Sequence, residues 1–306
     1  MNMRAFSAKL LLFGEYGLMF GAKALAIPFA NYQGSLVKPE SADSDPGNRD
    51  SVVELERFVS WIQHEGVNAK MNFPLDLSRL NLDIGKNLHF RSDVPLQYGV
   101  GSSGALCAAL FHEYSCYGQL IGREKRKHSL PNLLKQDFAL LESYFHGRSS
   151  GLDPLVSFLN QPVLLEDGQI SLPSLTLDQL PWSVYLIDTG MTGATSPLVR
   201  LFLNKMEDRD FNALFQQVYL PANDGAVASF IAHNQTKLFT CLEEITRFQL
   251  AHFSEMIPAG FVEMISSLRG QNIFVKLLGS GGGGFLQAYV PKNVQFPLLQ
   301  GSIKVF

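Results

Sequence analysis

A loop rich in glycine and serine leads into an apolar, alanine-rich segment between Pro95 and Leu110. Glycines let a backbone approach a ligand closely, and the unpaired N–H groups at the start of a helix attract anions. Ser102 and Ser103 add hydroxyls where the helix is expected to begin. The segment therefore predicts a phosphate-binding loop. Its candidate ligand-binding residues are Gly99, Val100, Gly101, Ser102, Ser103 and Gly104.

Simpler interpretations of this loop exist. A plain N-cap at Ser102 would account for one serine but not for the glycines beside it. The pattern G-x-G-x-x-G occurs at Gly99–Gly104 and at Gly279–Gly284, but the first copy lacks a preceding Val/Ile-rich strand and the second is followed by a strand. Neither fits a dinucleotide-binding unit, and the P-loop pattern G-x-x-x-x-G-K-[ST] does not occur in the sequence.

Two carboxylates eleven residues apart, Glu142 and Asp153, flank a turn rich in glycine and serine. Phosphoryl transfer needs one carboxylate to help hold Mg²⁺ and often another to accept the proton of the attacking hydroxyl. This pair can supply both. The alternative is that Glu142 is a solvated helix residue and that Asp153 caps a helix beginning at Pro154. His146 lies beside this acidic segment.

Lys9 places a cation at the start of an apolar run, Leu10–Phe13. Buried lysines are rare unless they are paired, so Lys9 could stabilise ionised Asp153 or a transferring phosphoryl group. Alternatively, it is a strand-edge lysine whose ammonium reaches water. Glu15 and Tyr16 in the following turn could bind substrate or face water.

A third glycine-rich segment places five glycines in the six positions Gly279–Gly284. So many glycines weaken a strand, and they are tolerated where another backbone or a ligand must come close. We expect a loop against a phosphate chain or an adjoining sheet, with a mobile hairpin as the alternative. The glycines assigned this structural role are Gly279, Gly281, Gly282 and Gly283.

The elements that must position these residues indicate an α+β fold in two lobes. Strands are expected at Leu10–Phe13, Ala24–Phe29, Gln33–Lys38, Leu88–Arg91, Trp182–Ile187, Ile273–Leu277 and Phe285–Val290. Helices are expected at Val52–His64, Ser102–Tyr117, Asn132–Phe145, Asp224–Ala232 and Gln235–Phe253. A shift toward helical sequence places a domain boundary near residue 180, giving domains 1–180 and 181–306. The polar segment Pro39–Asp50 predicts a surface loop.

Composition and charge narrow the functional classes. The 306 residues carry a formal charge of −3, which leaves no strong positive field for nucleic-acid phosphates, and we expect no nucleic-acid partner. The basic cluster Arg123–His128 is interpreted as a solvated connection. Three widely spaced cysteines and no signal-peptide pattern predict a cytoplasmic protein. The uncharged stretch Val94–Phe111 holds too many glycines and polar residues for a membrane helix.

Three segments resemble, in this order, the motifs of the galactokinase, homoserine kinase, mevalonate kinase and phosphomevalonate kinase (GHMP kinase) superfamily. AKLLLFGEYG resembles the first motif, PLQYGVGSSGAL the second and KLLGSGGGG the third, and together they span Ala8 to Gly284. FSAKLLLFGEYG and ESYFHGRSSGLDP look like mevalonate kinase segments. The resemblance implies an N-terminal lobe of the ribosomal-protein-S5 type and a ferredoxin-like C-terminal lobe.

The resemblance also implies an activity, the Mg-ATP-dependent phosphorylation of the primary hydroxyl of mevalonate. It makes Asp153 the catalytic base and Lys9 its electrostatic partner, with Ser103 and Glu142 as ligands of Mg²⁺. IDTGMTGAT is similar to the segment whose last threonine, here Thr195, lies by the substrate. The implied substrate-binding residues are Lys9, Glu15, Tyr16, His146, Asp153 and Thr195.

Two departures from the family pattern bear on the identity of the acceptor. Position 16 is Tyr where many mevalonate kinases have His, and position 104 is Gly where Ala is usual. A phosphomevalonate kinase would need extra cationic groups, and none is evident near the motifs. A catalytically silent nucleotide-binding module is the non-enzyme alternative, and intact Lys9, Glu142 and Asp153 argue against it. A homodimer is kept as an expectation for assembly.

Overall fold

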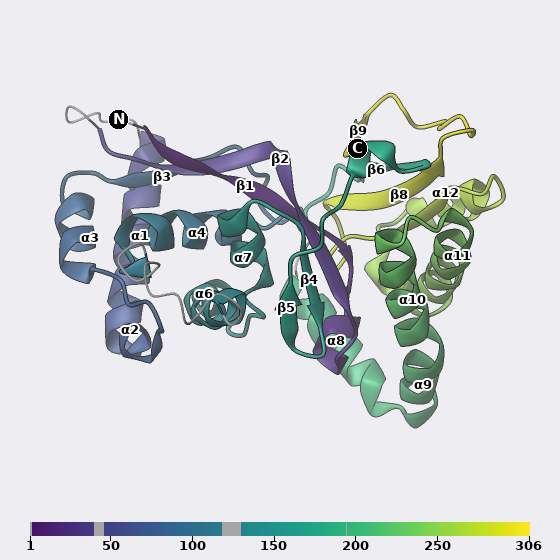
Figure 1. Ribbon diagram of the computed structural model, residues 1–306, viewed down its shortest axis with the longest axis horizontal. Helices are drawn as coiled ribbons and strands as arrows, with labels where there is room; N and C mark the ends of the chain where they lie inside the picture. The colour runs from purple at the N-terminus through teal and green to yellow at the C-terminus, as the bar shows by residue number, and fades with distance from the viewer. Residues whose placement is uncertain (1, 40–45, 118–129, 194) are drawn as a thin grey trace. The chain divides into compact units, whose positions relative to one another are not determined.

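The structure is a computed structural model that describes residues 2–39, 46–117, 130–193 and 195–306 (Figure 1). It divides into two compact units. Unit 1 comprises Met1–Leu10, Ile27–Pro95 and Gly101–Val163, and unit 2 comprises Leu11–Ala26, Leu96–Val100 and Leu164–Phe306. The predicted solvated connection Arg123–His128 lies outside the described residues. None of the helices in the described part of the chain is long and apolar enough to cross a membrane.

This division of the chain differs from the single domain boundary predicted near residue 180. The change from unit 1 to unit 2 falls after Val163, and residues 11–26 and 96–100 also belong to unit 2. The cause is the length of the first two strands, β1 (Asn2–Phe13) and β2 (Ala24–Val37), each of which contributes residues to both units. A shift in composition along the chain does not reveal such shared strands. The division into kinase domains at 1–180 and 181–306 stays a prediction.

The first sheet has the strand order β1-β2-β4-β5, with β3 paired to β2. Its shorter strands are β3 (His89–Ser92), β4 (Val163–Glu166) and β5 (Gln169–Ser171). β3 runs antiparallel to β2, so that Val37 lies opposite His89. The two strands predicted at Ala24–Phe29 and Gln33–Lys38 are one continuous strand, because the exposed residues between them keep an extended backbone.

Helix α4 (Ser102–Tyr114) lies in the interior of unit 1, and its residues from Gly104 to Phe111 are all buried. It packs against α6 (Leu130–His146) and α7 (Leu152–Leu159). The ring of Phe111 lies 4.8 Å from that of Phe138 and 5.4 Å from that of Phe158. A helix buried on all sides is held by such packing rather than by an amphipathic face, and it fixes the position of its own N-terminus.

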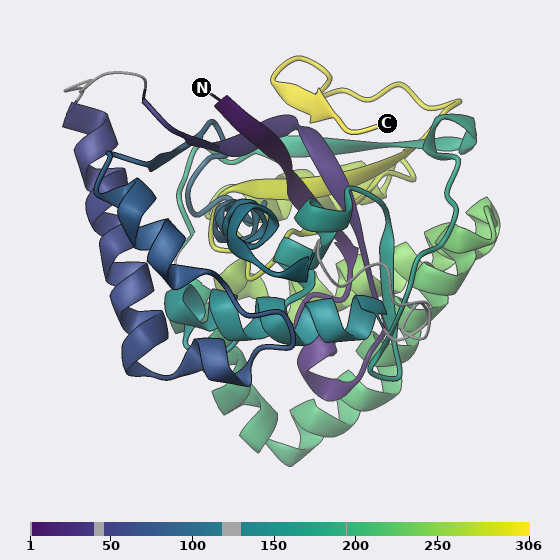
Figure 2. The ribbon, with the colours of Figure 1, turned by 60° about the vertical axis from the view of Figure 1, so that its left-hand side comes forward.

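Three further helices belong to unit 1, namely α1 (Pro46–His64), α2 (Val67–Lys70) and α3 (Leu77–Ile84). Figure 2 shows the full length of α1. This helix begins at Pro46, so the surface loop predicted at Pro39–Asp50 is too long at its C-terminal end. Proline has no N–H and is preorganised for the first turn of a helix, which explains a helix start at this residue.

Unit 2 is built on an antiparallel sheet with the strand order β7-β8-β6-β9. Its strands are β6 (Trp182–Asp188), β7 (Phe274–Leu277), β8 (Phe285–Pro291) and β9 (Ser302–Lys304). The first three confirm the strands predicted there. The helical segments are η1 (Gly17–Phe20), η3 (Leu177–Gln179), α8 (Thr195–Glu207), α9 (Arg209–Leu214), η4 (Phe215–Tyr219), α10 (Leu220–Ile231), α11 (Gln235–His252), η5 (Ser254–Met256) and α12 (Phe261–Arg269). Helices α11 and α12 pack on β7, and the mixed α+β class is confirmed.

Candidate active site

A buried lysine and an aspartate form the centre of the candidate active site in unit 1. Lys9 lies in β1 between the fully buried Ala8 and Leu10, and only 5% of its surface is exposed. Its Nζ lies 3.1 Å from Oδ2 of Asp153, whose side chain is 29% exposed. The interpretation of Lys9 as a strand-edge lysine reaching water is therefore wrong. The ammonium neutralises a carboxylate that an incoming molecule can still reach.

Asp153 does not cap the helix in which it lies. Helix α7 begins one residue earlier, at Leu152, and its N-cap is Gly151, with φ of 73° and no side-chain capping bond. The carboxylate is directed to Lys9 instead of to the N–H groups of its own helix. The capping interpretation is wrong, and the carboxylate is held by a cation.

The N-terminus of α4 lies against this ion pair. Its N-cap is Gly101, with φ of 78°, and no side chain caps the helix, so the N-cap interpretation of Ser102 is wrong. A Cβ at Gly101 would lie 2.9 Å from Cγ of Lys9 and 3.4 Å from Oδ2 of Asp153. Glycine is therefore required twice, for its conformation and for the close approach. The uncapped helix start provides N–H groups suited to an anion.

The contact between α4 and α7 explains why position 104 is glycine. A Cβ at this position would lie 2.9 Å from the carbonyl carbon of Asp153 and 3.0 Å from the nitrogen of Pro154. Both atoms are backbone, which cannot turn aside as a side chain can. Glycine at position 104 thus allows α4 to cross the start of α7 at short range. Gly99 and Val100, the first residues of the predicted phosphate loop, belong to unit 2.

Glu142 is buried near the end of α6, with 3% of its surface exposed. Its Oε1 accepts a hydrogen bond of 3.3 Å from Ser103 Oγ, and its Oε2 accepts one from Ser149 Oγ. Burial, and to a lesser degree repulsion from the Asp153 carboxylate, raises the pKa of Glu142 to about 8. The interpretation of Glu142 as a solvated helix residue is wrong. A cation bound beside this carboxyl would favour its ionised form.

His146 ends α6 and lies beside the same hydroxyl. Its Nε2 is 3.1 Å from Ser103 Oγ. Desolvation by the surrounding protein lowers the pKa of His146, Lys9 lowers it further, and Asp153 opposes the shift. The imidazole is therefore neutral near pH 7 and can exchange a hydrogen bond with Ser103.

Ser103 and Glu142 could together hold a magnesium ion. Hydroxyl and carboxylate oxygens are ligands that Mg²⁺ accepts, and it takes the remaining ones from water and from substrate phosphates. Across the described ranges, no group of three or more His, Cys, Asp or Glu side chains could hold a metal ion. Ser103 and Glu142 would supply two oxygens to such an ion and leave its other positions to water and phosphate oxygens.

Glu15 in unit 2 is buried in an ion pair with Lys276 of β7, with 3% and 1% of their surfaces exposed. The Glu15 carbonyl also accepts a bond from Tyr219 Oη. The water-facing alternative for Glu15 is wrong. Sequence reasoning missed Lys276, although the signal was present, because one charged residue in an otherwise apolar strand is the pattern that identified Lys9.

Tyr16 is buried in unit 2 and has the left-handed φ of 58°. Its ring lies 4.5 Å from that of Phe202 and 5.2 Å from that of Phe253, and burial raises the pKa of its hydroxyl. Tyr16 Oη donates a hydrogen bond of 2.7 Å to the carbonyl of Ser280. The tyrosine thus ties the turn after β1 to the third glycine-rich segment, and its water-facing alternative is wrong.

The third glycine-rich segment packs against other backbone of unit 2. A Cβ at Gly281 would lie 2.5 Å from Met256 O, one at Gly283 would lie 2.6 Å from the carbonyl carbon of Thr192, and one at Gly284 would lie 2.6 Å from Tyr98 Cα. Such packing rules out a mobile hairpin. A Cβ at Gly282 would lie 2.5 Å from the side chain of Leu198, whereas one at Gly279 would make only an ordinary contact of 3.8 Å with Gly99. The remaining predicted site residue, Thr195, begins α8, and its side chain lies outside the described part of the chain.

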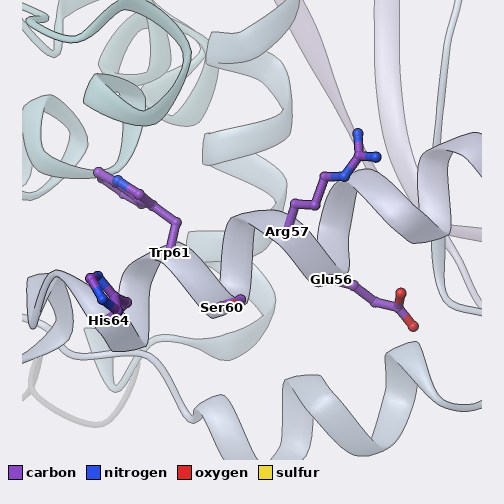
Figure 3. A pocket seen from close by; sticks show the side chains of 5 residues that line it. All are labelled: Glu56, Arg57, Ser60, Trp61 and His64. Atoms are coloured by element: carbon purple, nitrogen blue, oxygen red, sulfur yellow. The ribbon is translucent and has the colours of Figure 1, made fainter.

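A surface hollow of about 510 Å³ lies on α1 in unit 1 (Figure 3). Its lining residues all come from this helix and are Glu56, Arg57, Ser60, Trp61 and His64. The Trp61 ring lies 6.1 Å from that of Phe58 and 5.4 Å from that of Tyr144. None of the lining residues belongs to the motifs, so the hollow is a feature of the helix surface and not of the candidate site.

Similarity to known proteins extends over nearly the whole chain. No protein-family model matches it. It is 25% identical over 312 residues to a mevalonate kinase of Thermococcus gammatolerans, covering 94% of this chain and 88% of that protein. It is 27% identical over 309 residues to a mevalonate kinase of Pyrococcus horikoshii, covering 93% and 87%.

Solved structures show the fold. The chain matches L. major mevalonate kinase in complex with R-mevalonate at a TM-score of 0.61 and 16% identity, covering 95% of this chain and 89% of that one. It matches Methanococcus jannaschii mevalonate kinase at 0.58 and 13%, covering 95% and 91%. It matches Lactococcus lactis galactokinase complexed with galactose at 0.61 and 14%, covering 94% and 84%. The resemblance carried by the three motifs is confirmed.

The raised pKa of Glu142 predicts how stability depends on pH in the metal-free protein. Between its ordinary value of 4.5 and about 8, the folded chain keeps a proton that the unfolded chain has lost. The free energy of unfolding contributed by this carboxyl is therefore fully present below about pH 4.5 and is lost as the pH rises toward about 8. Glu142→Gln should become progressively more stable than the parent protein from about pH 5 to about pH 8. Thermal unfolding with a chelator measures this, with the exposed Glu56→Gln as control, and a difference that does not vary with pH would contradict the prediction.

Proposed function

We propose that this chain, which belongs to the GHMP kinase superfamily, is an ATP-dependent mevalonate kinase. It transfers the γ-phosphoryl group of ATP to the primary hydroxyl of mevalonate, giving 5-phosphomevalonate and ADP. The relatives described above carry that name and are similar over more than nine tenths of this chain. The observation that carries the proposal is the Lys9–Asp153 pair against the uncapped N-terminus of α4.

Asp153 is the proposed base. Its carboxylate accepts the proton of the acceptor hydroxyl as that oxygen forms its bond to phosphorus and the bond to ADP breaks. A carboxylate so close to phosphate would be repelled without a cation. Lys9, 3.1 Å away, removes this repulsion and orients the carboxylate. Its ammonium also faces the charge that develops on the transferring group.

The N-terminus of α4 is proposed to bind the ATP phosphates. Its first-turn N–H groups have no side-chain cap, and the dipole of the helix favours negative charge there. The hydroxyls of Ser102 and Ser103 lie in the same turn. Because Gly101 and Gly104 permit close contact with Lys9 and α7, the anion site and the base belong to one packed cluster.

Ser103 and Glu142 are proposed to hold Mg²⁺, and the ion would neutralise charge on the ATP phosphates. The fit rests on a buried carboxyl whose ionised form is disfavoured until a cation is added. Neutral His146 bonds Ser103 and can keep the hydroxyl oriented. The protein's part is to fix these oxygens beside the base.

The acceptor side of the site rests on resemblance. Glu15, Tyr16 and Thr195 are proposed to contact the hydroxy acid, with Glu15 oriented by Lys276. Phosphomevalonate kinase is the nearest alternative, and it would need extra cationic groups for the second phosphate. A cytoplasmic location and a homodimeric assembly also remain proposals.

An ADP-release assay with four acceptors tests the function. Turnover should depend on mevalonate, and phosphomevalonate, galactose and homoserine should support little. Asp153→Asn should lower kcat by about 10² to 10⁴-fold, the usual contribution of a general base, while ATP binding is retained. Asp50→Asn, which changes an exposed aspartate of α1, should behave as the parent protein.

Each outcome of that assay is decisive. Preference for another acceptor would replace mevalonate and leave the kinase assignment standing. ATP binding without turnover on any acceptor would support the silent nucleotide-binding module. Parental activity in Asp153→Asn would remove Asp153 from the role of base.

The close approach at Gly101 gives a separate prediction. Gly101→Ala and Gly66→Ala both place a methyl group on a residue with a left-handed φ. Each should lower the free energy of unfolding by about 1 to 2 kcal/mol. Only the first meets Lys9, whereas the space around Gly66 is empty to 4 Å. Gly101→Ala should therefore lower kcat/KM at least about tenfold, since displaced catalytic groups lose rate steeply. Gly66→Ala should leave kcat/KM unchanged, and equal kinetic effects in the two variants would contradict this account of the site.

A further inference from the structure

Two serine hydroxyls donate hydrogen bonds to the carboxyl group of Glu142, one to each oxygen. Ser103 Oγ donates to Oε1 at 3.3 Å, and Ser149 Oγ donates to Oε2. All three side chains belong to unit 1, and the carboxylate is buried. The motifs identify Ser103 and Glu142 as metal ligands but indicate no role for Ser149.

The hydroxyl of Ser149 has a defined direction. Its oxygen accepts a hydrogen bond of 3.0 Å from the backbone N–H of Gly151. With a donor already on its oxygen, the hydroxyl proton points to Glu142. Ser149 therefore links the carboxylate at the end of α6 to the N-cap of α7, the helix that carries Asp153.

The connection between α6 and α7 is packed tightly enough to fix this link. Gly151 has φ of 73°, and a Cβ there would lie 2.2 Å from Lys135 O and 2.6 Å from Ala139 N. The turn thus rests on the backbone of α6. Ser149 lies two residues earlier in this turn and is bonded to the N–H of Gly151 and to Glu142.

Ser103 cannot perform the same task while it serves a metal ion. Its Oγ lies 3.1 Å from His146 Nε2 as well as 3.3 Å from Glu142. A hydroxyl that directs a lone pair to a cation keeps one proton for one acceptor. Ser149 is not a proposed metal ligand. Its oxygen accepts from the N–H of Gly151, and its proton is donated to Glu142.

We propose that Ser149 is a positioning residue for the metal site, an inference that rests on the proposed function. By occupying Oε2 it makes Glu142 present Oε1, together with Ser103 Oγ, to the divalent cation that accompanies the nucleotide. Hydrogen bonds that orient metal ligands are worth about 10 to 100-fold in metal affinity or activity.

The test measures metal binding without turnover. Binding of Mn²⁺ to the full chain with ADP is followed by electron paramagnetic resonance. Ser149→Ala should raise the Kd for Mn²⁺ about tenfold. Ser149→Thr, which keeps the hydroxyl, should restore parental binding. Ser150→Ala is the matched control, because Ser150 Oγ bonds only the N–H of Leu152 among the contacts described, and its Kd should not change.

Steady-state kinetics supply a second measurement. Ser149→Ala should raise the apparent KM for free Mg²⁺ about as much as it raises the Kd for Mn²⁺, and should leave the KM for mevalonate within twofold of the parent value. If Ser149→Ala does not fold, Ser149→Cys replaces it, and its weak S–H donor should give an intermediate Kd.

Three results would overturn the inference: a Kd for Ser149→Ala within twofold of the parent value, equal weakening in Ser150→Ala, or no Mn²⁺ binding by the parent protein. Failure of the proposed function is separate. A parent protein that binds Mn²⁺ and ADP but turns over no acceptor would refute the kinase and still decide the role of Ser149.

Discussion

A lysine ammonium that is almost entirely buried must be paired, and in unit 1 its partner is Asp153. This pairing sets the requirements for the segments around it. Strand β1 must be buried on both faces to carry Lys9, and α7 must begin before Asp153 so that the carboxylate is not used as a cap. Removing one partner would leave an uncompensated charge, which is strongly destabilising in a protein interior.

Close packing of helices on the ion pair explains the glycines of the second motif. Gly101 and Gly104 allow the start of α4 to approach Lys9 and the backbone of Asp153 at distances that a methyl group would obstruct. The buried α4 is in turn held by aromatic contacts of Phe111. An anion at the N-terminus of this helix would therefore lie close to the Lys9 ammonium and the Asp153 carboxylate, and to Ser103 with its bond to Glu142.

The sequence predicted the elements with local signals and missed features that depend on distant partners. The apolar run after Ser103 is a local signal, and it correctly predicts a helix there. The isolated charge of Lys9 is also local, but the sequence leaves two interpretations of it, and only its burial beside Asp153 decides between them. Lys276 and Glu15 are 261 residues apart, so their pairing had no local trace. The role of Ser149 depends on the shape of the turn before α7. Helix α3 was not predicted. Asp76 is an N-cap residue type, and in the structure its side chain accepts a capping bond from Arg79 N.

The central claim is that Lys9 and Asp153 act as one catalytic unit. A double-mutant cycle on kcat with Lys9→Met, Asp153→Asn and the double variant tests it directly, because groups that work together lose their effect only once. The account predicts that the double variant is about as slow as Asp153→Asn alone. Independent, multiplicative losses from the two substitutions would contradict it.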